Sequence, residues 1–247
     1  MRENEQKNAN IIEDNGGTAP NRRMKDSVFV DLFGRDRYFK ENFISLYNAL
    51  HGTRLSPENT AVEPEMLDSA LYMSYANDVA MQIDGRIVVL IEHQSTINRN
   101  MPLRLLDYIT RIYEKVVPSR KKFARAVVKI PAPEFYVLYN GRDDFPAESE
   151  MRLSDAFIYP EGEEKPEQVP LELVVKVYNI NLGRGDRLLA KCETLRQYSA
   201  FIELVRYAHN NAEQEHIEKP LDWAVKEAIR QGILPEYLER KASEHST

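Results

Sequence analysis

The chain has 247 residues, a net charge of −6 and a single cysteine, Cys192. One cysteine excludes an intrachain disulfide and a cysteine-rich zinc site. No run approaches the roughly 20 apolar residues that cross a bilayer, and no signal-peptide core is present. We therefore expect a cytoplasmic protein with no membrane partner. The acidic balance argues against a coat-like nucleic-acid binder but not against a nuclease, which confines its basic residues to a groove.

The first quarter of the chain predicts a polar tail followed by two short helices. Residues 1–23 have no apolar period and predict a disordered tail. Apolar residues at helical spacing then predict one helix around Val28–Phe33 and a second that ends near Gly52. Residues 53–64 are rich in turn-forming residues and predict a loop.

A strand hairpin is expected next. Its first run lies within Leu71–Gln82 and its second is Arg86–Gln94, with Asp84-Gly85 between them as a turn signal. The second run contains the continuous apolar stretch Ile87–Ile91, which predicts a central strand buried on both faces.

Alternating helix and strand signals fill the rest of the chain. In order they are a helix from Pro102 to Pro118, a strand at Phe135–Tyr139, an irregular polar segment 142–168, a strand at Leu171–Tyr178, a long helix from Asp186 to about His209 and a last helix from Pro220 to Gly232. This order predicts an α/β fold: a mixed central sheet flanked by helices, with a C-terminal helical extension. We expect the domain at 24–210 and the extension at 211–247.

Two acids, Asp78 and Glu92, flank the hairpin, and their relation depends on the turn. A two-residue turn at Asp84-Gly85 places Asp78 opposite Ile91, so the two carboxylates lie on opposite faces. A three-residue loop with Gly85 as a left-handed bulge residue places Asp78 opposite Leu90 instead. Asp78 and Glu92 are then diagonal neighbours on one face, close enough to share an ion. We expect the three-residue form.

This arrangement predicts a divalent-metal site. Mg²⁺ prefers carboxylate, carbonyl and water oxygens, which Asp78, Glu92 and the backbone carbonyl of His93 would supply, with Mn²⁺ as a substitute. Such an ion activates water and stabilises charge on a phosphate. Gln94, two residues after Glu92 on the same strand face, is placed to hold the attacking water.

The run NDVAMQIDGRIVVLIEHQSTINRNMPLRLLDYITRIYE (77–114) resembles the Rpn family (recombination-promoting nuclease/putative transposase), a branch of the PD-(D/E)XK nuclease superfamily. The likeness continues through KDSVFVDLF, PEFYVLYNG, LELVVKVYNIN and AVKEAIRQGILPEYLERK, so it covers roughly residues 24–241.

The resemblance implies a restriction-endonuclease-like core and magnesium-dependent DNA cleavage in recombination or mobile elements. It puts Asp78 at the motif aspartate, Glu92 at the second acid and Gln94 at the position where the superfamily usually has lysine. Asp26 resembles the upstream acid of the family. The glutamine leaves a second interpretation open, a nuclease-fold module that binds DNA or protein without cleaving; an RNA-directed nuclease is a third.

Basic residues supply the expected DNA contacts. Arg104, Arg111 and Lys115 recur at helical spacing, with Arg99 in the preceding loop, and such a line can follow a phosphate backbone. An ordinary solvated helix face explains the same spacing equally well. A second basic cluster, at 120–125, has the same two interpretations. A homodimer is one option for assembly.

Overall fold

The computed structural model describes residues 28–64, 78–93, 98–164 and 166–244, without the side chains of residues 91–93 and Asp186. The predictions for residues 1–23, for Asp26 and for Gln94 lie outside this description, and so does the side chain of Glu92.

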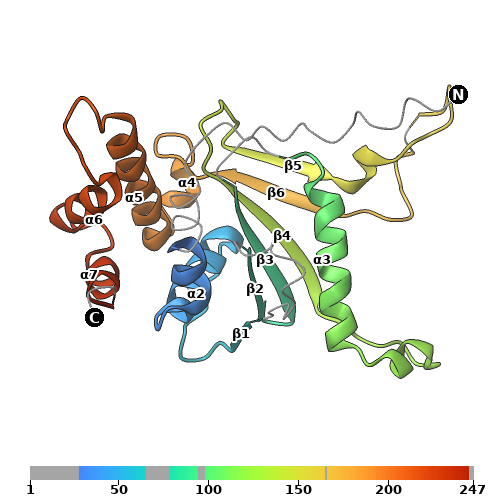
Figure 1. Ribbon diagram of the computed structural model, residues 1–247. Helices are drawn as coiled ribbons and strands as arrows, with labels where there is room; N and C mark the ends of the chain where they lie inside the picture. Colours follow the sequence, from blue (N-terminus) through green and yellow to red (C-terminus); the bar gives the residue numbers. More distant parts are fainter. Residues whose placement is uncertain (1–27, 65–77, 94–97, 165, 245–247) are drawn as a thin grey trace, which may run out of the picture.

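Six strands form one open, mixed sheet (Figure 1). They are β1 (Val62–Pro64), β2 (Asp78–Ile83), β3 (Arg86–His93), β4 (Ala132–Tyr139), β5 (Glu148–Arg152) and β6 (Val174–Asn179), in the spatial order β1-β2-β3-β4-β6-β5. The pairs β3–β4 and β4–β6 are parallel, and the other three pairs are antiparallel. The parallel centre brings the carboxyl ends of β3, β4 and β6 to one edge.

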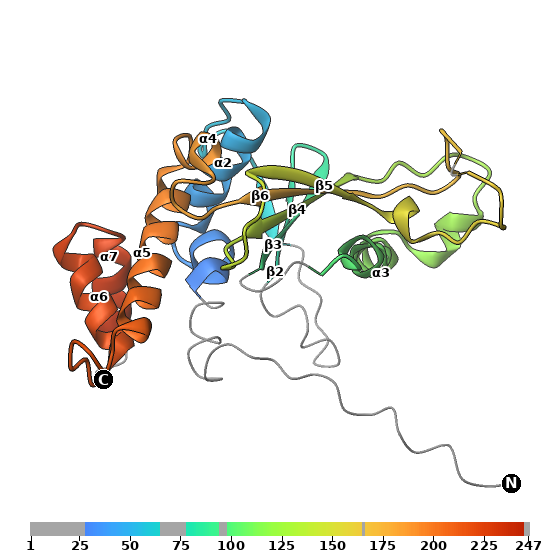
Figure 2. The ribbon, with the colours of Figure 1, turned by 90° about the horizontal axis from the view of Figure 1, so that it is seen from above.

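Helices cover both faces of this sheet (Figure 2). They are η1 (Asp31–Arg35), α2 (Phe39–His51), α3 (Met101–Val116), η3 (Ser119–Phe123), η4 (Leu153–Ala156), α4 (Asp186–Leu189), α5 (Glu193–Asn210), α6 (Pro220–Arg230) and α7 (Pro235–Glu244). Helix α3 lies on one face and α2 and α5 lie on the other, with α6 and α7 packed beyond α5 (Figures 1 and 2). The predicted α/β fold with a C-terminal helical extension is confirmed.

The sheet separates two apolar cores. The core under α3 contains Ala80, Ile87 and Val89, whereas the core under α2 and α5 contains alternate residues of the same strands, among them Val79 and Leu90. Strand β3 is therefore buried on both faces, as its continuous apolar run predicts. None of the described helices is long and apolar enough to cross a membrane.

The expected hairpin register is wrong. Ile83 pairs with Arg86, and Asp78 lies opposite Ile91, so the loop is the two-residue turn. Asp84 and Gly85 both have positive φ, 47° and 69°, which is the conformation of a type I′ turn. Such a turn twists in the same sense as the strands it joins, so the ladder continues to the turn without a bulge.

Some helices and strands differ from those predicted from the sequence. The expected long helix at 186–209 is two helices, α4 and α5, separated by a turn around Lys191. The segments interpreted as loop and as irregular contain the edge strands β1 and β5. Both edge strands are short and largely exposed, so they lack the apolar alternation that marks a strand in sequence.

Candidate active site

Asp78 is the first residue of β2, at the end of the hairpin away from the turn. Its Oδ2 atom is buried and has no hydrogen-bond partner among the residues that the structure describes. Burial raises the pKa of the Asp78 carboxyl to about 7, against a smaller opposing effect of the Arg104 guanidinium. A buried carboxylate with an unpartnered oxygen destabilises the fold unless a proton or a cation joins it.

The chemistry of Asp78 fits a hard divalent cation, which binds carboxylate oxygen. Within the described part of the chain, no group of three or more His, Cys, Asp or Glu side chains is gathered for metal binding. Among the described side chains, the Asp78 carboxylate alone could supply one ligand, and a complete ligand set would need groups beyond them.

The observed register changes the relation between the two acids. Asp78 pairs with Ile91, so position 92 lies one residue farther along β3 on the adjacent strand. Positions 78 and 92 are close but alternate in the ladder. The prediction that they share one sheet face as diagonal neighbours is thus wrong at the level of the backbone.

The carboxyl ends of the three parallel strands bring several polar residues together. His93 pairs with Tyr139, and Tyr139 pairs with Asn179, so the last residues of β3, β4 and β6 lie side by side. Ligands of open α/β sheets bind at this edge, outside the carboxyl ends of the strands. The end of β3, with Glu92, and the residue that follows β4, Asn140, therefore belong to one candidate site.

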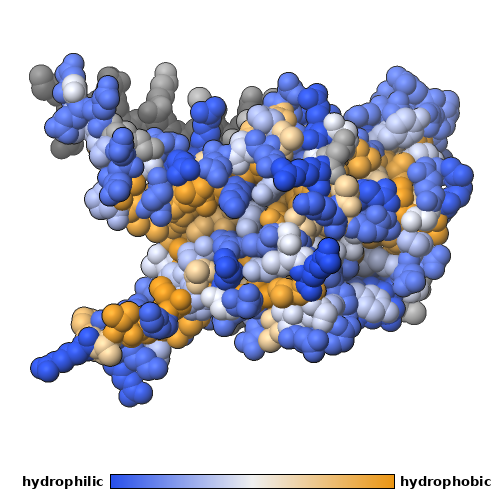
Figure 3. Space-filling model, turned by 180° about the vertical axis from the view of Figure 1, so that it is seen from behind, coloured by the Kyte–Doolittle hydropathy of each residue, from blue (hydrophilic) through white to orange (hydrophobic). Residues whose placement is uncertain are grey.

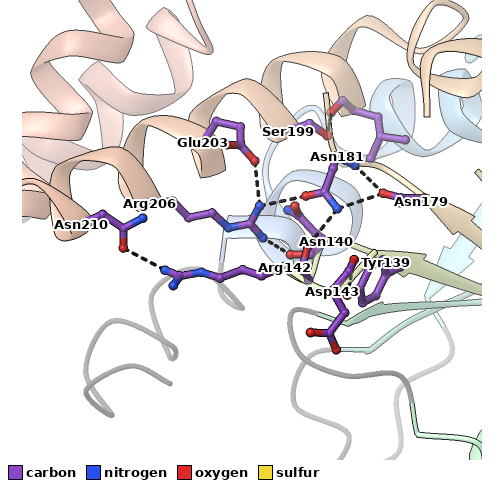
Figure 4. Close-up of polar contacts among 12 residues, drawn as sticks. Tyr139, Asn140, Arg142, Asp143, Asn179, Asn181, Ser199, Glu203, Arg206 and Asn210 are labelled. Atoms are coloured by element: carbon purple, nitrogen blue, oxygen red, sulfur yellow. Dashed lines mark hydrogen bonds and ion pairs between the residues drawn. The ribbon is translucent and has the colours of Figure 1, made fainter. Parts of the chain in front are cut away.

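An arginine from α5 organises the polar groups at this edge (Figure 4). Arg206 Nη1 donates to Asn181 Oδ1 at 2.8 Å and to Glu203 Oε1 at 2.7 Å, and Nη2 donates to the backbone carbonyl of Asn140. Asn181 Nδ2 in turn donates to Asn179 Oδ1 at 2.9 Å. This network fixes the backbone that follows β4 and β6.

Asn140 differs from its neighbours in the network. Its side chain is buried, with 1% of the residue exposed, and neither its Nδ2 nor its Oδ1 has a hydrogen-bond partner within the described part of the chain. Asn179, equally buried, donates to the Phe145 carbonyl at 2.8 Å and accepts from Asn181. The Asn140 amide is thus a donor and an acceptor that the described residues do not use.

Two glycines allow the chain to approach this closely. A Cβ on Gly185 would lie 1.8 Å from the carbonyl oxygen of Asn179, and a Cβ on Gly141 would lie 2.4 Å from the Tyr139 side chain. Neither position accepts a side chain without displacement of the strand end. Glycine at both positions keeps the loops packed against the edge.

The predicted DNA-contact residues lie along and before α3. Arg99 is exposed in the preceding turn, Arg104 is half-buried beside Asp78, and Lys115 is exposed in the last turn. Arg111 Nε forms an ion pair with Asp107 Oδ2 at 3.1 Å. An acid therefore interrupts the basic line, and α3 alone does not provide an unopposed positive face.

Sequence reasoning missed Asn140 as a site residue. An Asn-Gly pair after an apolar strand is a common turn signal, so the sequence around Asn140 indicates a turn and not a site. The additional signal is the second pair of asparagines, Asn179 and Asn181, at the end of the neighbouring parallel strand. Polar residues that follow two adjacent parallel strands meet at one edge.

A comparison with protein-family models matches residues 55–219 to the family described as "putative transposase, YhgA-like". The chain belongs to this YhgA-like family. The match spans the hairpin, α3, β4 and the amide network, and it confirms the resemblance to the Rpn and transposase group. No curated protein and no solved structure matches the chain.

Proposed function

We propose that this member of the YhgA-like family is a metal-dependent DNA endonuclease that hydrolyses phosphodiester bonds in recombination or mobile-element movement. The observation that carries the proposal is the Asp78 carboxyl group, at the hairpin position that resembles the nuclease motif aspartate. Its Oδ2 atom is buried and has no hydrogen-bond partner among the described residues. A fold keeps a costly group of this kind where a ligand offsets its desolvation.

The candidate ligands are Asp78, Glu92 and the backbone carbonyl of His93. Positions 78 and 92 alternate across the ladder, so these residues would hold an ion from two neighbouring strands and not as diagonal neighbours on one sheet face. When bound there, Mg²⁺ supplies charge stabilisation for a phosphate and lowers the pKa of a coordinated water.

Other residues act on substrate and water in this proposal. Gln94 accepts a hydrogen bond from the attacking water and orients it, but it adds no positive charge where a lysine would. Asp26 is the candidate for an additional acid near the site. Arg99, Arg104, Arg111 and Lys115 are candidates to contact DNA phosphates, with Arg104 nearest to Asp78.

The test compares nicking of supercoiled plasmid by the wild type and by Asp78→Asn with Mg²⁺, with Mn²⁺ and with EDTA. Asp78→Asn keeps the side-chain shape but loses the ligand charge, so we expect at least a 100-fold lower rate, comparable to the loss when a catalytic electrostatic group is removed. Asp222→Asn, at an exposed aspartate on α6, is the matched control and should cleave normally. Cleavage by Asp78→Asn at the wild-type rate would contradict the proposal, and a parallel RNA substrate identifies an RNA-directed nuclease.

One sequence feature favours a second function. Gln94 stands where the resembling superfamily has its lysine, and loss of that charge favours a module that binds DNA or protein without cleaving it. This alternative predicts salt-sensitive DNA binding that needs no metal and is unchanged by Asp78→Asn. Metal-dependent nicking by the wild type rejects it.

A further inference from the structure

The segment Pro118–Pro131, here called the basic arm, connects the end of α3 to the start of β4 and projects from the body of the protein (Figure 1). It contains the single turn η3 and is otherwise irregular. Its base is held in place, because Val117 is buried and Tyr113 Oη donates to the Pro131 carbonyl at 2.7 Å. The arm is therefore an anchored projection with a defined direction.

Positive charge is concentrated on the basic arm. It carries five cations and no acid, in a chain whose net charge is −6. These are Arg120, Lys121, Lys122, Arg125 and Lys129. Among the described residues, none of the five side chains has an ion-pair or hydrogen-bond partner, whereas Arg111 and Arg196 pair with acids on their own helices.

The basic arm also exposes apolar side chains. Phe123 is 88% exposed, Val127 is 83% exposed and Ile130 is 48% exposed. The arm appears at the lower left of Figure 3 as apolar patches beside strongly polar groups. Between the arm and the end of α3 lies a hollow of about 390 Å³, lined by Tyr113, Val117 and basic arm residues. Apolar side chains exposed together indicate a surface that a partner covers.

We propose that the basic arm is a binding surface for double-stranded DNA. Its five cations contact phosphates on successive nucleotides, and Phe123 packs against sugar or base edges in a groove, as apolar wedge residues of minor-groove binders do. This inference deepens the proposed function, since it names the surface that holds the substrate, but DNA binding by the arm does not require that the chain cleave DNA.

Charge and shape favour DNA over other partners. A membrane-surface segment needs a helix with one continuous apolar face, whereas η3 is a single turn with one large apolar residue, Phe123. An extended segment with unpaired cations and scattered apolar groups is suited instead to a polyanion with regularly spaced charges. Duplex DNA carries one phosphate per strand about every 3.4 Å.

The arm contacts DNA well away from the candidate active site. Helix α3 has 16 residues and is about 24 Å long, with Arg104 beside Asp78 near its start and the arm at its other end. Substitutions on the arm therefore leave the Asp78 site unchanged. They should weaken binding and raise KM, with little effect on kcat.

The experiment measures fluorescence anisotropy of a labelled 30-base-pair duplex in EDTA, between 50 and 200 mM salt. The arm variant replaces Arg120, Lys121, Lys122, Arg125 and Lys129 with glutamine. Each phosphate contact contributes roughly 0.9 to the slope of log affinity against log salt, so we expect the slope to fall by about 3 to 4.5 and the affinity at low salt to fall at least tenfold. An unchanged slope and affinity would overturn the proposal.

The matched control removes the same charge from the helical side of the molecule. It replaces Lys191, Lys219, Lys226, Arg196 and Arg230 with glutamine, all of them exposed residues on or beside α5 and α6. This control should keep most of the wild-type salt slope. An equal loss in both variants would mean that total charge, not the arm, determines binding, and would also overturn the proposal.

The role of Phe123 is separable from that of the cations. Phe123→Ala should weaken duplex binding several-fold without changing the salt slope, because an apolar contact releases no counterions. Wild-type affinity in Phe123→Ala would refute the groove contact. Two further controls test other partners of the arm. If the arm variant keeps its DNA binding but no longer binds phosphatidylserine vesicles, the arm is a membrane-binding surface. If it keeps its DNA binding but loses a dimer in sedimentation velocity, the arm binds a second copy of the chain.

Failure of the arm proposal and failure of the proposed nuclease are distinguishable. Asp78→Asn should abolish cleavage but keep the wild-type salt slope, whereas the arm variant should lose the slope. If the wild type never cleaves DNA but the slope falls in the arm variant, the nuclease is wrong and the arm proposal holds. If cleavage depends on Asp78 and the salt slope of the arm variant equals that of the wild type, the arm proposal is wrong and the nuclease proposal holds.

Discussion

At the scale of single residues, Asp78 is a group whose burial opposes folding. Its pKa in the folded protein is raised to about 7 by burial, above the ordinary value near 4 in an unfolded chain. The folded state therefore holds the proton more tightly, and the penalty is absent below about pH 4, grows as pH rises and is complete above about pH 7.

Replacement of this residue should stabilise the protein. In EDTA, Asp78→Asn should raise the free energy of unfolding at pH 7.5 by up to about 4 kcal/mol, the equivalent of three pKa units. The gain should disappear near pH 4. Urea denaturation at both pH values measures the difference, and a variant less stable than the wild type at pH 7.5 would show that the carboxylate has an unrecognised stabilising partner.

Asn140 and Asn179 are two equally buried amides that should respond in opposite ways. The Asn140 side chain makes no hydrogen bond to any described residue, whereas Asn179 binds Phe145 and Asn181. Leucine at position 140 removes an unsatisfied group and should leave the midpoint of thermal unfolding unchanged or higher. Leucine at position 179 leaves the hydrogen-bonding groups of Phe145 and Asn181 without their partner and should lower the free energy of unfolding by about 2 kcal/mol or more. Equal destabilisation of the two variants would mean that Asn140 has a structural partner.

At the scale of elements, the hairpin shows what the sequence can and cannot predict. The turn residues were identifiable because Asp-Gly suits positive φ. The register was not, because Ile87–Ile91 is apolar at every position and β3 is buried on both faces. A strand without alternation fits its neighbour equally well after a one-residue shift. The break before α5 was not predictable for a similar reason. Leu188, Cys192 and Leu195 lie on both sides of the break and are all buried, so their apolar spacing resembles that of one continuous helix.

A polar cluster links three elements at the opposite edge of the sheet. Glu134 on β4 accepts hydrogen bonds from Arg86 on β3, from His51 at the end of α2 and from Tyr136. Burial alone would raise the pKa of Glu134, but these hydrogen bonds outweigh burial and hold it below its ordinary value.

The cluster should make the protein less stable as pH falls, as is usual for a carboxyl group with a lowered pKa. A carboxyl with a lowered pKa stabilises the fold above the pKa of the unfolded chain, and the stabilisation is lost as pH falls through the folded value. Glu134→Gln should therefore cost about 1–3 kcal/mol at pH 7, with a smaller cost at pH 3.5. Urea midpoints at the two values test this, and a cost independent of pH would contradict the ionised carboxylate.

At the scale of the whole molecule, the C-terminal helix is tied to the beginning of the described chain. Tyr237 Oη donates to Asp31 Oδ2 at 2.9 Å, Lys241 pairs with the same carboxylate at 3.0 Å, and Arg240 pairs with the buried Asp36. The sequence indicated a helix around Val28–Phe33 and a helical extension at 211–247, but the last helix it predicted ended at Gly232, so it indicated neither α7 nor these contacts. Partners some 200 residues apart are brought together only when α5, α6 and α7 pack against each other and η1.

Removal of one partner should show how strongly this closure depends on paired charge. Among the described residues, Arg240→Ala leaves the buried Asp36 carboxylate with the Tyr38 amide as its one donor, and breaking a buried pair in this way costs about 3–5 kcal/mol. Asp36→Asn in the same chain removes the stranded charge, so the double variant should recover part of that loss, and a double-mutant cycle in urea measures the coupling. Additive losses would mean that the ends of the chain are held by apolar packing around Tyr237 and Leu238, and that the ion pair contributes little to closing the fold.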